Sequence, residues 1–415
     1  MKRRTFLTTV AALPLSFGLA SIARAKGALA VLLPPWGTLP KEMTDKYTAD
    51  TGLTLDIQTL GWDEIHTKIA TSMVAGTPPA SATEMDWSWV GQFGAAGWYD
   101  DLTPLVPADV LADIPTAAIF TYDGKLIGVP YNNDFRVMIY NKAHLDAAGV
   151  AVPKTMDDLL AAARAIKAKG AAEYPIGLPL SVSEGAATAW YLLTKAFGGD
   201  LFDKDFKPLF TGPESAGFKA MQFEVDALKE GLIDPASTGL KDNEVQELFK
   251  AGKISFDLAG QAGILAVYTD PAKSQVAADA HAALVPNVTG TSRSFGLPEA
   301  IGVPVSAENK DQIATYLTWM LKPEVMAANY KALGTLPTRL TVLAALGADG
   351  SLKEGDVLAA QAAVAEPLFA QGTPAWYTEF SGAVQSALNE AAKGNIDVAT
   401  AMTQIADAAA AAQAG

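Results

Sequence analysis

One short segment of the chain sets polar chemistry between two apolar runs. Residues 126–130 and 137–140 each have the apolar composition of a buried strand, and a tight hairpin between them would favour Gly, which is absent there. Carboxylate, amide and guanidinium groups in such a place satisfy exposed backbone groups or hydrogen-bond a polar ligand. Both roles stay open from the residues alone. The four polar side chains are Asn132, Asn133, Asp134 and Arg136.

Aromatic side chains follow several predicted strands, in places beside a carboxylate. In open α/β sheets, ligands bind outside the carboxyl ends of the strands. The apolar face of a sugar ring packs on an aromatic ring, while a carboxylate accepts hydrogen bonds from hydroxyl groups. Ordinary half-buried packing is an equally good interpretation of each Trp. The candidates are Trp36, Trp62, the run Asp86-Trp87-Ser88-Trp89 and the pair Trp376-Tyr377.

Signatures of catalysis and of metal binding are weak. The chain has three histidines, none of them at a metal-binding spacing, and no cysteine, which excludes disulfides, thiolate catalysis and a lipid-modified Cys anchor. It lacks the Gly-x-Ser-x-Gly elbow and the phosphate-binding loop. A carboxylate pair for glycoside hydrolysis need not be local in sequence, so that activity stays open. We predict no catalytic residue, no metal site and no cofactor.

Length and charge limit the class of protein. A chain of 415 residues is long for one core, so we expect two lobes. The formal net charge of −14 disfavours nucleic acid and anionic membrane surfaces as partners. The alternation of strand and helix patterns predicts an α/β fold with mainly parallel sheets. Local signals include an Asp-Gly hairpin at 121–126 and a helix from Thr155 to Lys169 that opens with a capping box.

Residues 1–25 have the pattern of an export signal. A basic start is followed by a mostly apolar stretch, and Ala23-Arg24-Ala25 is an A-x-A-like cleavage site. The run Arg3-Arg4-Thr5-Phe6-Leu7 resembles a twin-arginine signal, with Sec export as the alternative. No later apolar run is long enough to span a bilayer. We therefore expect a soluble periplasmic protein without a lipid anchor.

Several modest motifs occur in a fixed order along the chain. Together they resemble the extracellular solute-binding proteins of carbohydrate ABC transporters, a maltodextrin-binding-protein-like family. The motifs are DGKLIGVP at 123–130, IYNK at 139–142 with AG at 148–149 and PKT at 153–155, FKAGK at 249–253 with DLAG at 257–260, KPE at 322–324 and GTLPTR at 334–339.

This resemblance implies the periplasmic-binding-protein fold. Two α/β lobes would be joined by crossover hinge strands, with the ligand in the cleft between them, and the polar segment described above would be the first crossover. The implied division is a signal peptide at 1–25, an N-terminal lobe at 26–132 and 301–345, and a C-terminal lobe at 133–300 and 346–415.

The resemblance also implies a function and a set of ligand contacts. The chain would be a monomer that closes on a carbohydrate and delivers it to an ABC permease in the inner membrane. Two aromatic platforms of the family are missing, after Gly260 and at 184–188, which favours a mono- or disaccharide, a polyol or a sugar derivative over a long maltodextrin. A polyamine or another non-sugar solute is the alternative ligand. The implied contacts are Trp36, Asp86, Trp87, Asn133, Asp134, Arg136, Gly260, Gln261, Trp376 and Tyr377.

Overall fold

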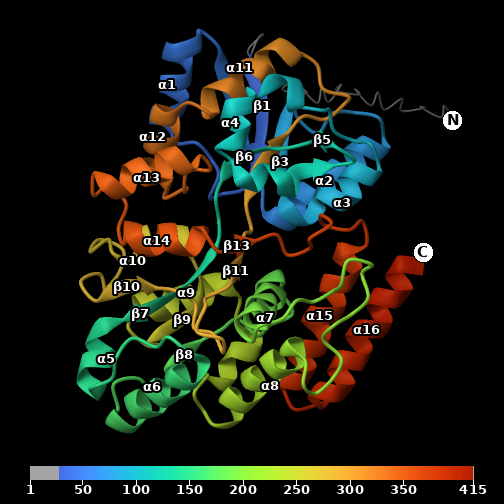
Figure 1. The fold of residues 1–415 in the computed structure, drawn as a ribbon. Coiled ribbons are helices and arrows are strands. Elements are labelled where there is room, and N and C mark those ends of the chain that lie inside the picture. The colour runs from blue at the N-terminus through green and yellow to red at the C-terminus, as the bar shows by residue number, and fades with distance from the viewer. Residues whose placement is uncertain (1–27, 415) are drawn as a thin grey trace, which may run out of the picture.

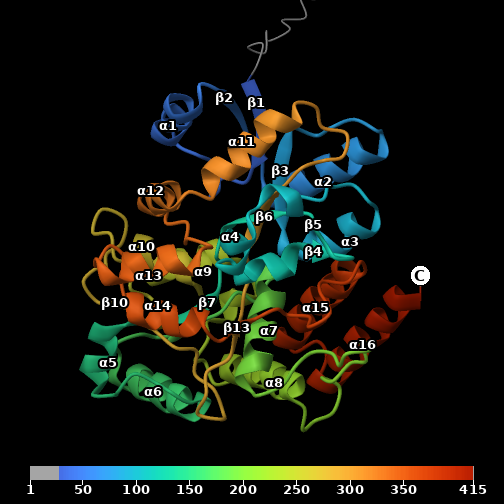
Figure 2. The same cartoon turned by 45° about the horizontal axis from the view of Figure 1, so that its top comes forward.

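The computed structural model describes residues 28–414, so the predicted signal segment 1–25 lies outside the described residues. The chain forms two lobes, each built on its own β-sheet and surrounded by helices (Figures 1 and 2). This arrangement confirms the predicted two-lobed α/β class.

The sheet of the first lobe has five strands in the order β2-β1-β3-β12-β6. Strand β1, which lies between β2 and β3, has the sequence ALAVLL and is almost wholly buried, as expected for a parallel strand covered on both faces. Its strands are β1 (Ala28–Leu33), β2 (Thr54–Thr59), β3 (Ala82–Asp86), β6 (Val129–Asn132) and β12 (Glu299–Gly302). Its helices are α1 (Lys41–Thr51), α2 (Trp62–Val74), α3 (Val90–Ala95), α4 (Ala108–Ala112), α11 (Lys310–Met320) and α12 (Pro323–Leu333) (Figure 1).

The sheet of the second lobe has four strands in the order β10-β7-β9-β8. Four of its helices, α7, α8, α15 and α16, pack on one another beside this sheet (Figure 1). Its strands are β7 (Arg136–Asn141), β8 (Ile176–Gly177), β9 (Phe256–Gln261) and β10 (Ala280–Ala283). Its helices are α5 (Lys142–Ala148), α6 (Met156–Lys169), α7 (Glu184–Ala196), α8 (Ala216–Lys229), α9 (Asp242–Lys250), α10 (Leu265–Tyr268), α15 (Tyr377–Ala392) and α16 (Val398–Ala414).

The prediction of mainly parallel sheets is wrong. Strands β1, β2 and β3 are parallel, but β12 is antiparallel to both β3 and β6, and β7 is antiparallel to both β9 and β10. The reason is the crossover. Strand β6 carries the chain out of the first lobe and β12 brings it back, so the two strands must run in opposite directions.

The chain passes between the lobes at three places. The first passage, at 133–135, joins β6 to β7, and the second precedes β12. The third runs beside the first, because the N–H of Asn133 donates to the carbonyl of Leu336 at 3.0 Å and Thr338 Oγ1 donates to the carbonyl of Pro130 at 3.1 Å. Strand β12 includes Glu299 and Ala300, so the lobe boundary expected at 300/301 falls within a strand of the first sheet.

Short elements complete the connections. The Asp-Gly turn joins β4 to β5, and Asp123 has the left-handed φ of 47° that such a turn requires. Thr155 and Asp158 form the predicted capping box at α6, with hydrogen bonds of 3.0 and 3.1 Å. These elements are β4 (Thr121–Tyr122), β5 (Lys125–Leu126), β11 (Ser294–Phe295), β13 (Ala365–Glu366), α13 (Leu340–Ala348) and α14 (Gly355–Ala362).

Candidate functional site

Strand β3 ends at Asp86, at the edge of the sheet that faces the second lobe. The carboxylate of Asp86 caps the following 3-10 turn, because Oδ1 accepts a hydrogen bond from the N–H of Ser88 at 2.8 Å. Its other oxygen accepts from Nε1 of Trp62 at 3.1 Å. Two of the aromatic and acidic candidates therefore meet here, one from a strand end and one from the start of α2.

Trp87 lies between the two lobes. Its ring centroid is 4.9 Å from that of Tyr377 at the start of α15 and 6.3 Å from that of Phe295 on β11. Trp87 is 4% exposed and Tyr377 is 2% exposed. The structure thus brings Tyr377, which lies far along the sequence, against the adjacent residues Asp86 and Trp87.

Glu299 is a buried carboxyl that the sequence analysis missed. It opens β12 and pairs with Asp86 across the sheet. Its Oε1 accepts a hydrogen bond from Nε1 of Trp36, and its Oε2 accepts from Nδ2 of Asn132 at 2.9 Å. Trp36 itself is 47% exposed. The sequence offered one signal for this residue: Glu299 is a single carboxylate between Pro298 and the apolar residues of β12.

The polar segment of the first crossover divides between two roles. The backbone of Asn133 holds the third passage of the chain, as described above. The side chain of Arg136 contacts the second lobe. Its Nη1 donates a hydrogen bond to the carbonyl of Ala259 at 3.2 Å, and its Nη2 donates to Oγ1 of Thr188 at 3.4 Å. Asp134 accepts one hydrogen bond, from Nε2 of Gln261 at 3.3 Å. Arg136 therefore braces the second lobe, while Asp134 keeps acceptor capacity.

The end of β9 places Gly260 and Gln261 beside this segment. Gln261 pairs with Arg136 and Gly260 pairs with Val137 in the antiparallel β7/β9 ladder. A Cβ on Gly260 would lie 3.0 Å from the side chain of Ile139, so the strand pair is closely packed there. Gln261 also receives a hydrogen bond of 3.4 Å from Gln246 on α9.

Glu184, the first residue of α7, forms the wall of the second lobe opposite Asp86. It accepts hydrogen bonds from the hydroxyl of Tyr377, from Ser381 Oγ at 2.6 Å and from Gln385 Nε2 at 3.1 Å. By the family resemblance, this position is one of the two missing aromatic platforms. A Glu at a helix start was its only local signal, and many such residues simply favour the helix dipole.

Burial raises the pKa of three carboxyls in this region. Desolvation is the largest cause for Asp134, whose pKa is raised to about 6, for Glu184, raised to about 7, and for Glu299, raised to about 8. The charge of Asp86 contributes to all three shifts, and the guanidinium of Arg136 opposes the shift at Asp134. The site is therefore acidic and largely removed from water.

Trp376 lies to the side of this cluster. It packs edge-on against Phe202, Phe206 and Phe380, with ring centroids 5.4 to 6.0 Å apart. It also lines a cavity of about 330 Å³ at the rim between the lobes, together with Tyr122 and other residues. If Trp376 stacks on a sugar as predicted, it would contact the part of the ligand that lies in this rim cavity.

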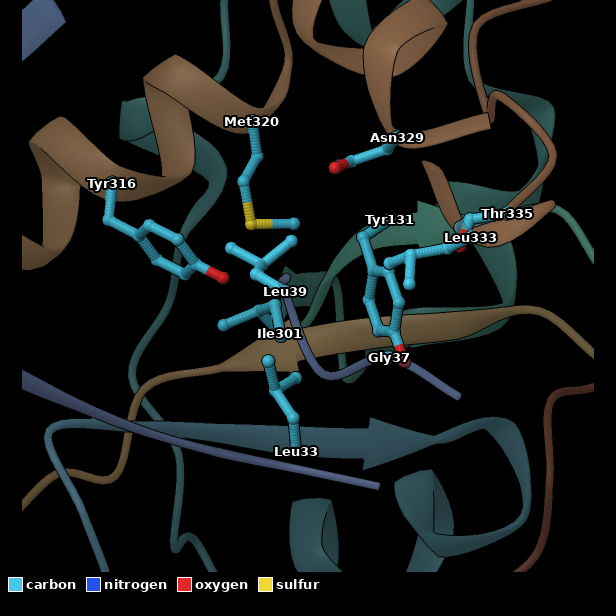
Figure 3. A pocket seen from close by; sticks show the side chains of 10 residues that line it. All are labelled: Leu33, Gly37, Leu39, Tyr131, Ile301, Tyr316, Met320, Asn329, Leu333 and Thr335. Atoms are coloured by element: carbon cyan, nitrogen blue, oxygen red, sulfur yellow. The ribbon is translucent and has the colours of Figure 1, made fainter. Parts of the chain in front are cut away.

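A second cavity, shown in Figure 3, lies behind the hinge strands within the first lobe. Met320, Ile301 and Leu33 point into it, and Tyr131 closes one side (Figure 3). Its volume is about 10 Å³, enough for one water molecule. It is too small for a solute and is a packing defect beside the hinge.

The three histidines lie apart and each has a local partner. His66 bonds to the Gln92 side chain, His144 to that of Ser255 and His281 to that of Glu354. Among residues 28–414, no group of three His, Asp or Glu side chains is arranged to hold a metal ion. None of the helices in this range is long and apolar enough to cross a membrane.

Solved structures share this architecture. A solute-binding protein of an ABC transporter from Thermotoga lettingae, bound with α-D-tagatose, matches with a TM-score of 0.79 and 22% identity over 93% of this chain and 99% of the other. A solute-binding protein from Agrobacterium radiobacter K84, in complex with ribitol, gives 0.80 and 19% over 92% and 97%.

Sequence comparison places the chain in a family. A probable amino-acid ABC transporter periplasmic-binding protein of Sinorhizobium fredii is 25% identical over 373 residues, which is 83% of this chain and 82% of that protein. Residues 35–327 match the family of bacterial extracellular solute-binding proteins. This match confirms the resemblance seen in the motifs: the chain belongs to the bacterial extracellular solute-binding protein family.

Proposed function

We propose that this protein binds a carbohydrate, in the size range from a polyol to a disaccharide, between its two lobes and delivers it to an ABC permease. The observation that carries the proposal is the meeting of Trp87 and Tyr377 across the lobes, with Asp86 and Glu184 beside them. Aromatic faces and charged acceptors are the groups that hold a ring and its hydroxyls. The ligands named for the two structural neighbours, tagatose and ribitol, support the same class.

No chemical step is part of this proposal. Hinge closure brings the lobes together on the ligand, and the closed form is what the permease would recognise. We propose that the protein acts as a monomer in the periplasm after removal of residues 1–25, exported by the twin-arginine route.

A second candidate is a non-sugar solute with an amino group, such as a polyamine or an amino acid. The acidic residues between the lobes favour it, and so does the name of the Sinorhizobium fredii relative. It differs from the first candidate in needing no hydroxyl groups on the ligand.

Thermal unfolding of residues 26–415 against sugars, polyols, polyamines and amino acids tests both candidates. A compound at about a hundred times its dissociation constant adds roughly 2.7 kcal/mol to the free energy of unfolding. A carbohydrate that raises the midpoint and is recovered unchanged by mass spectrometry supports the proposal. A carbohydrate that is hydrolysed contradicts it, and a shift with polyamines or amino acids alone favours the second candidate.

A further inference from the structure

Carboxylates from both lobes gather where the lobes meet. Asp86 and Glu299 come from neighbouring strands of the first sheet, and the others come from the first crossover, from the start of α7 and from the start of α9. The five are Asp86, Asp134, Glu184, Asp242 and Glu299.

Contacts join four of these residues, since Glu299 pairs with Asp86 across the sheet, and Asp134 interacts electrostatically with Asp86 and Asp242. Trp87, next to Asp86, packs on Tyr377, whose hydroxyl donates to Glu184. Gly185 follows Glu184, and a Cβ there would lie 1.8 Å from Oδ2 of Asp242, so the starts of α7 and α9 touch. The carboxylates are thus neighbours in one region and not scattered over the two lobes.

Positive charge does not balance this cluster. In residues 28–414, none of the five carboxylates forms an ion pair with a lysine, arginine or histidine. Arg136 interacts electrostatically with Asp134, but its Nη1 and Nη2 donate to Ala259 and Thr188, and its buried Nε has no hydrogen-bond partner among the described residues. His66 lies near Asp86 and shares a hydrogen bond with Gln92. The five carboxylates therefore have only two basic side chains near them among the described residues, the guanidinium of Arg136 and the imidazole of His66.

Two deeply buried side chains beside the cluster also keep free hydrogen-bonding capacity. Trp87 is 4% exposed, and its indole N–H has no partner among the described residues. Asp134 is 8% exposed, and its Oδ1 likewise accepts no hydrogen bond within residues 28–414. Neither of these two atoms is wholly enclosed, so both stay accessible to a ligand. One offers a hydrogen to a hydroxyl oxygen, and the other accepts from a cation.

From this arrangement we infer that the ligand carries a protonated amine in addition to its hydroxyl groups, as an amino sugar or an amino polyol does. The inference rests on the proposed function and narrows its ligand class. The ammonium group would lie among Asp134, Asp86 and Glu299, and the hydroxyls would meet Trp87 and Glu184.

The electrostatics of closure support this assignment. Burial raises the pKa of Asp134, Glu184 and Glu299, so protons balance part of the charge. A bound ammonium replaces those protons. Because it needs ionised carboxylates, an amine ligand that stays protonated binds more tightly as pH rises from 5 to 8. A neutral polyol gains nothing from that ionisation.

A matched pair of probes tests the inference. D-sorbitol and 1-amino-1-deoxy-D-sorbitol differ in one hydroxyl and one amine, and D-glucose, D-glucosamine and N-acetyl-D-glucosamine form a second set. Isothermal titration at pH 5.5, 6.5 and 7.5 is expected to show the amine member binding about 10- to 100-fold more tightly than the neutral member at pH 7.5, the size of a charge-assisted hydrogen bond. Its advantage should shrink as the pH falls.

Two variants localise the effect. Asp134→Asn keeps the size of the side chain and is expected to remove most of the amine preference. Asp407→Asn removes the same charge from an exposed position on α16 and should leave both affinities unchanged.

Each outcome has one meaning. A neutral member that binds as tightly as its amine, or an amine preference that Asp134→Asn leaves intact, overturns the inference and leaves carbohydrate binding standing. A panel in which no carbohydrate of either charge binds, with or without a response to spermidine, overturns the proposed function itself.

Discussion

Glu224 on α8 is a carboxyl that the binding site does not use. It is 1% exposed, and both of its oxygens lack a hydrogen-bond partner among residues 28–414. Burial raises its pKa well above the usual range. The folded protein therefore favours the neutral form of Glu224. The contribution of this group to stability is fully present below the pKa of Glu224 in the unfolded chain, and it is lost as the pH rises through the folded pKa.

We expect Glu224→Gln to raise the free energy of unfolding by about 1–3 kcal/mol at pH 7.5, because it removes the cost of an ionisable buried group. The gain should vanish near pH 3, where the glutamate side chain is neutral in both the folded and the unfolded state. Urea unfolding at the two pH values measures this. Glu308→Gln, at an exposed loop position, is the control and should change neither value. A loss of stability at pH 7.5 would show that Glu224 has a partner.

Tyr377 combines a ring contact with a hydrogen bond to a buried carboxyl. In Tyr377→Phe the ring still packs on Trp87, but Glu184 loses a donor, and we expect a loss of about 1–3 kcal/mol in unfolding free energy. Tyr122→Phe is the matched control, because the hydroxyl of Tyr122 has no hydrogen-bond partner among the described residues. Equal stabilities of the two variants would argue against a structural bond between Tyr377 and Glu184.

At the scale of elements, α3 and the loop before α15 come into close contact across the lobes. A Cβ on Gly91 would lie 2.2 Å from the carbonyl oxygen of Thr373 and 2.4 Å from the backbone of Pro374. Neither neighbour is a flexible side chain. The small size of Gly91 therefore permits the lobes to approach this closely.

Gly91→Ala is expected to hold the lobes apart at an overpacking cost of about 1–3 kcal/mol, which weakens ligand binding about tenfold or more. Small-angle scattering should show a larger radius of gyration than that of the parent protein. Gly382→Ala, on α15 with no atom within 4 Å of the new Cβ, should close normally. An unchanged radius for Gly91→Ala would mean that the loop 372–376 moves aside.

Local sequence signals predicted individual turns and helix caps well, but they did not predict which distant segments of the chain pack together. The capping box at Thr155 and the Asp-Gly hairpin depend on a few adjacent residues, and both are present. Asp86 and Trp87 were identified because they follow a buried strand. Glu184, Asp242 and Glu299 were missed, since a lone carboxylate at a helix start or strand start has no local pattern that distinguishes a site from a cap. Their proximity exists only after three segments of the chain pack together.

For the whole molecule, the acidic contact between lobes predicts a dependence of stability on pH. The pKa values of Asp134, Glu184 and Glu299 are raised in the folded state to about 6, 7 and 8. Each contributes stability below its unfolded pKa, and that contribution disappears as pH rises through the folded value.

The thermal midpoint of the protein without added solute is therefore expected to fall from pH 5 to pH 8. Carboxyls whose pKa is lowered, such as Asp113 and Asp200, lose their contribution at more acidic pH and do not offset this trend. Differential scanning calorimetry at constant ionic strength measures it. Glu299→Gln should flatten the upper part of the curve, and a midpoint that is constant or rises to pH 8 contradicts the prediction.

The order of the strands in the first sheet has a consequence for how the protein is made. Strand β12 lies between β3 and β6, although nearly 170 residues of the second lobe separate it from β6 in the chain, on the order of seconds to tens of seconds of synthesis. The second lobe in turn packs α15 and α16, the last helices, against α7 and α8. Neither lobe can complete its core on the ribosome until late in translation. An export pathway that carries folded proteins must wait for the whole chain, whereas a pathway that threads unfolded chains has a long interval in which to act.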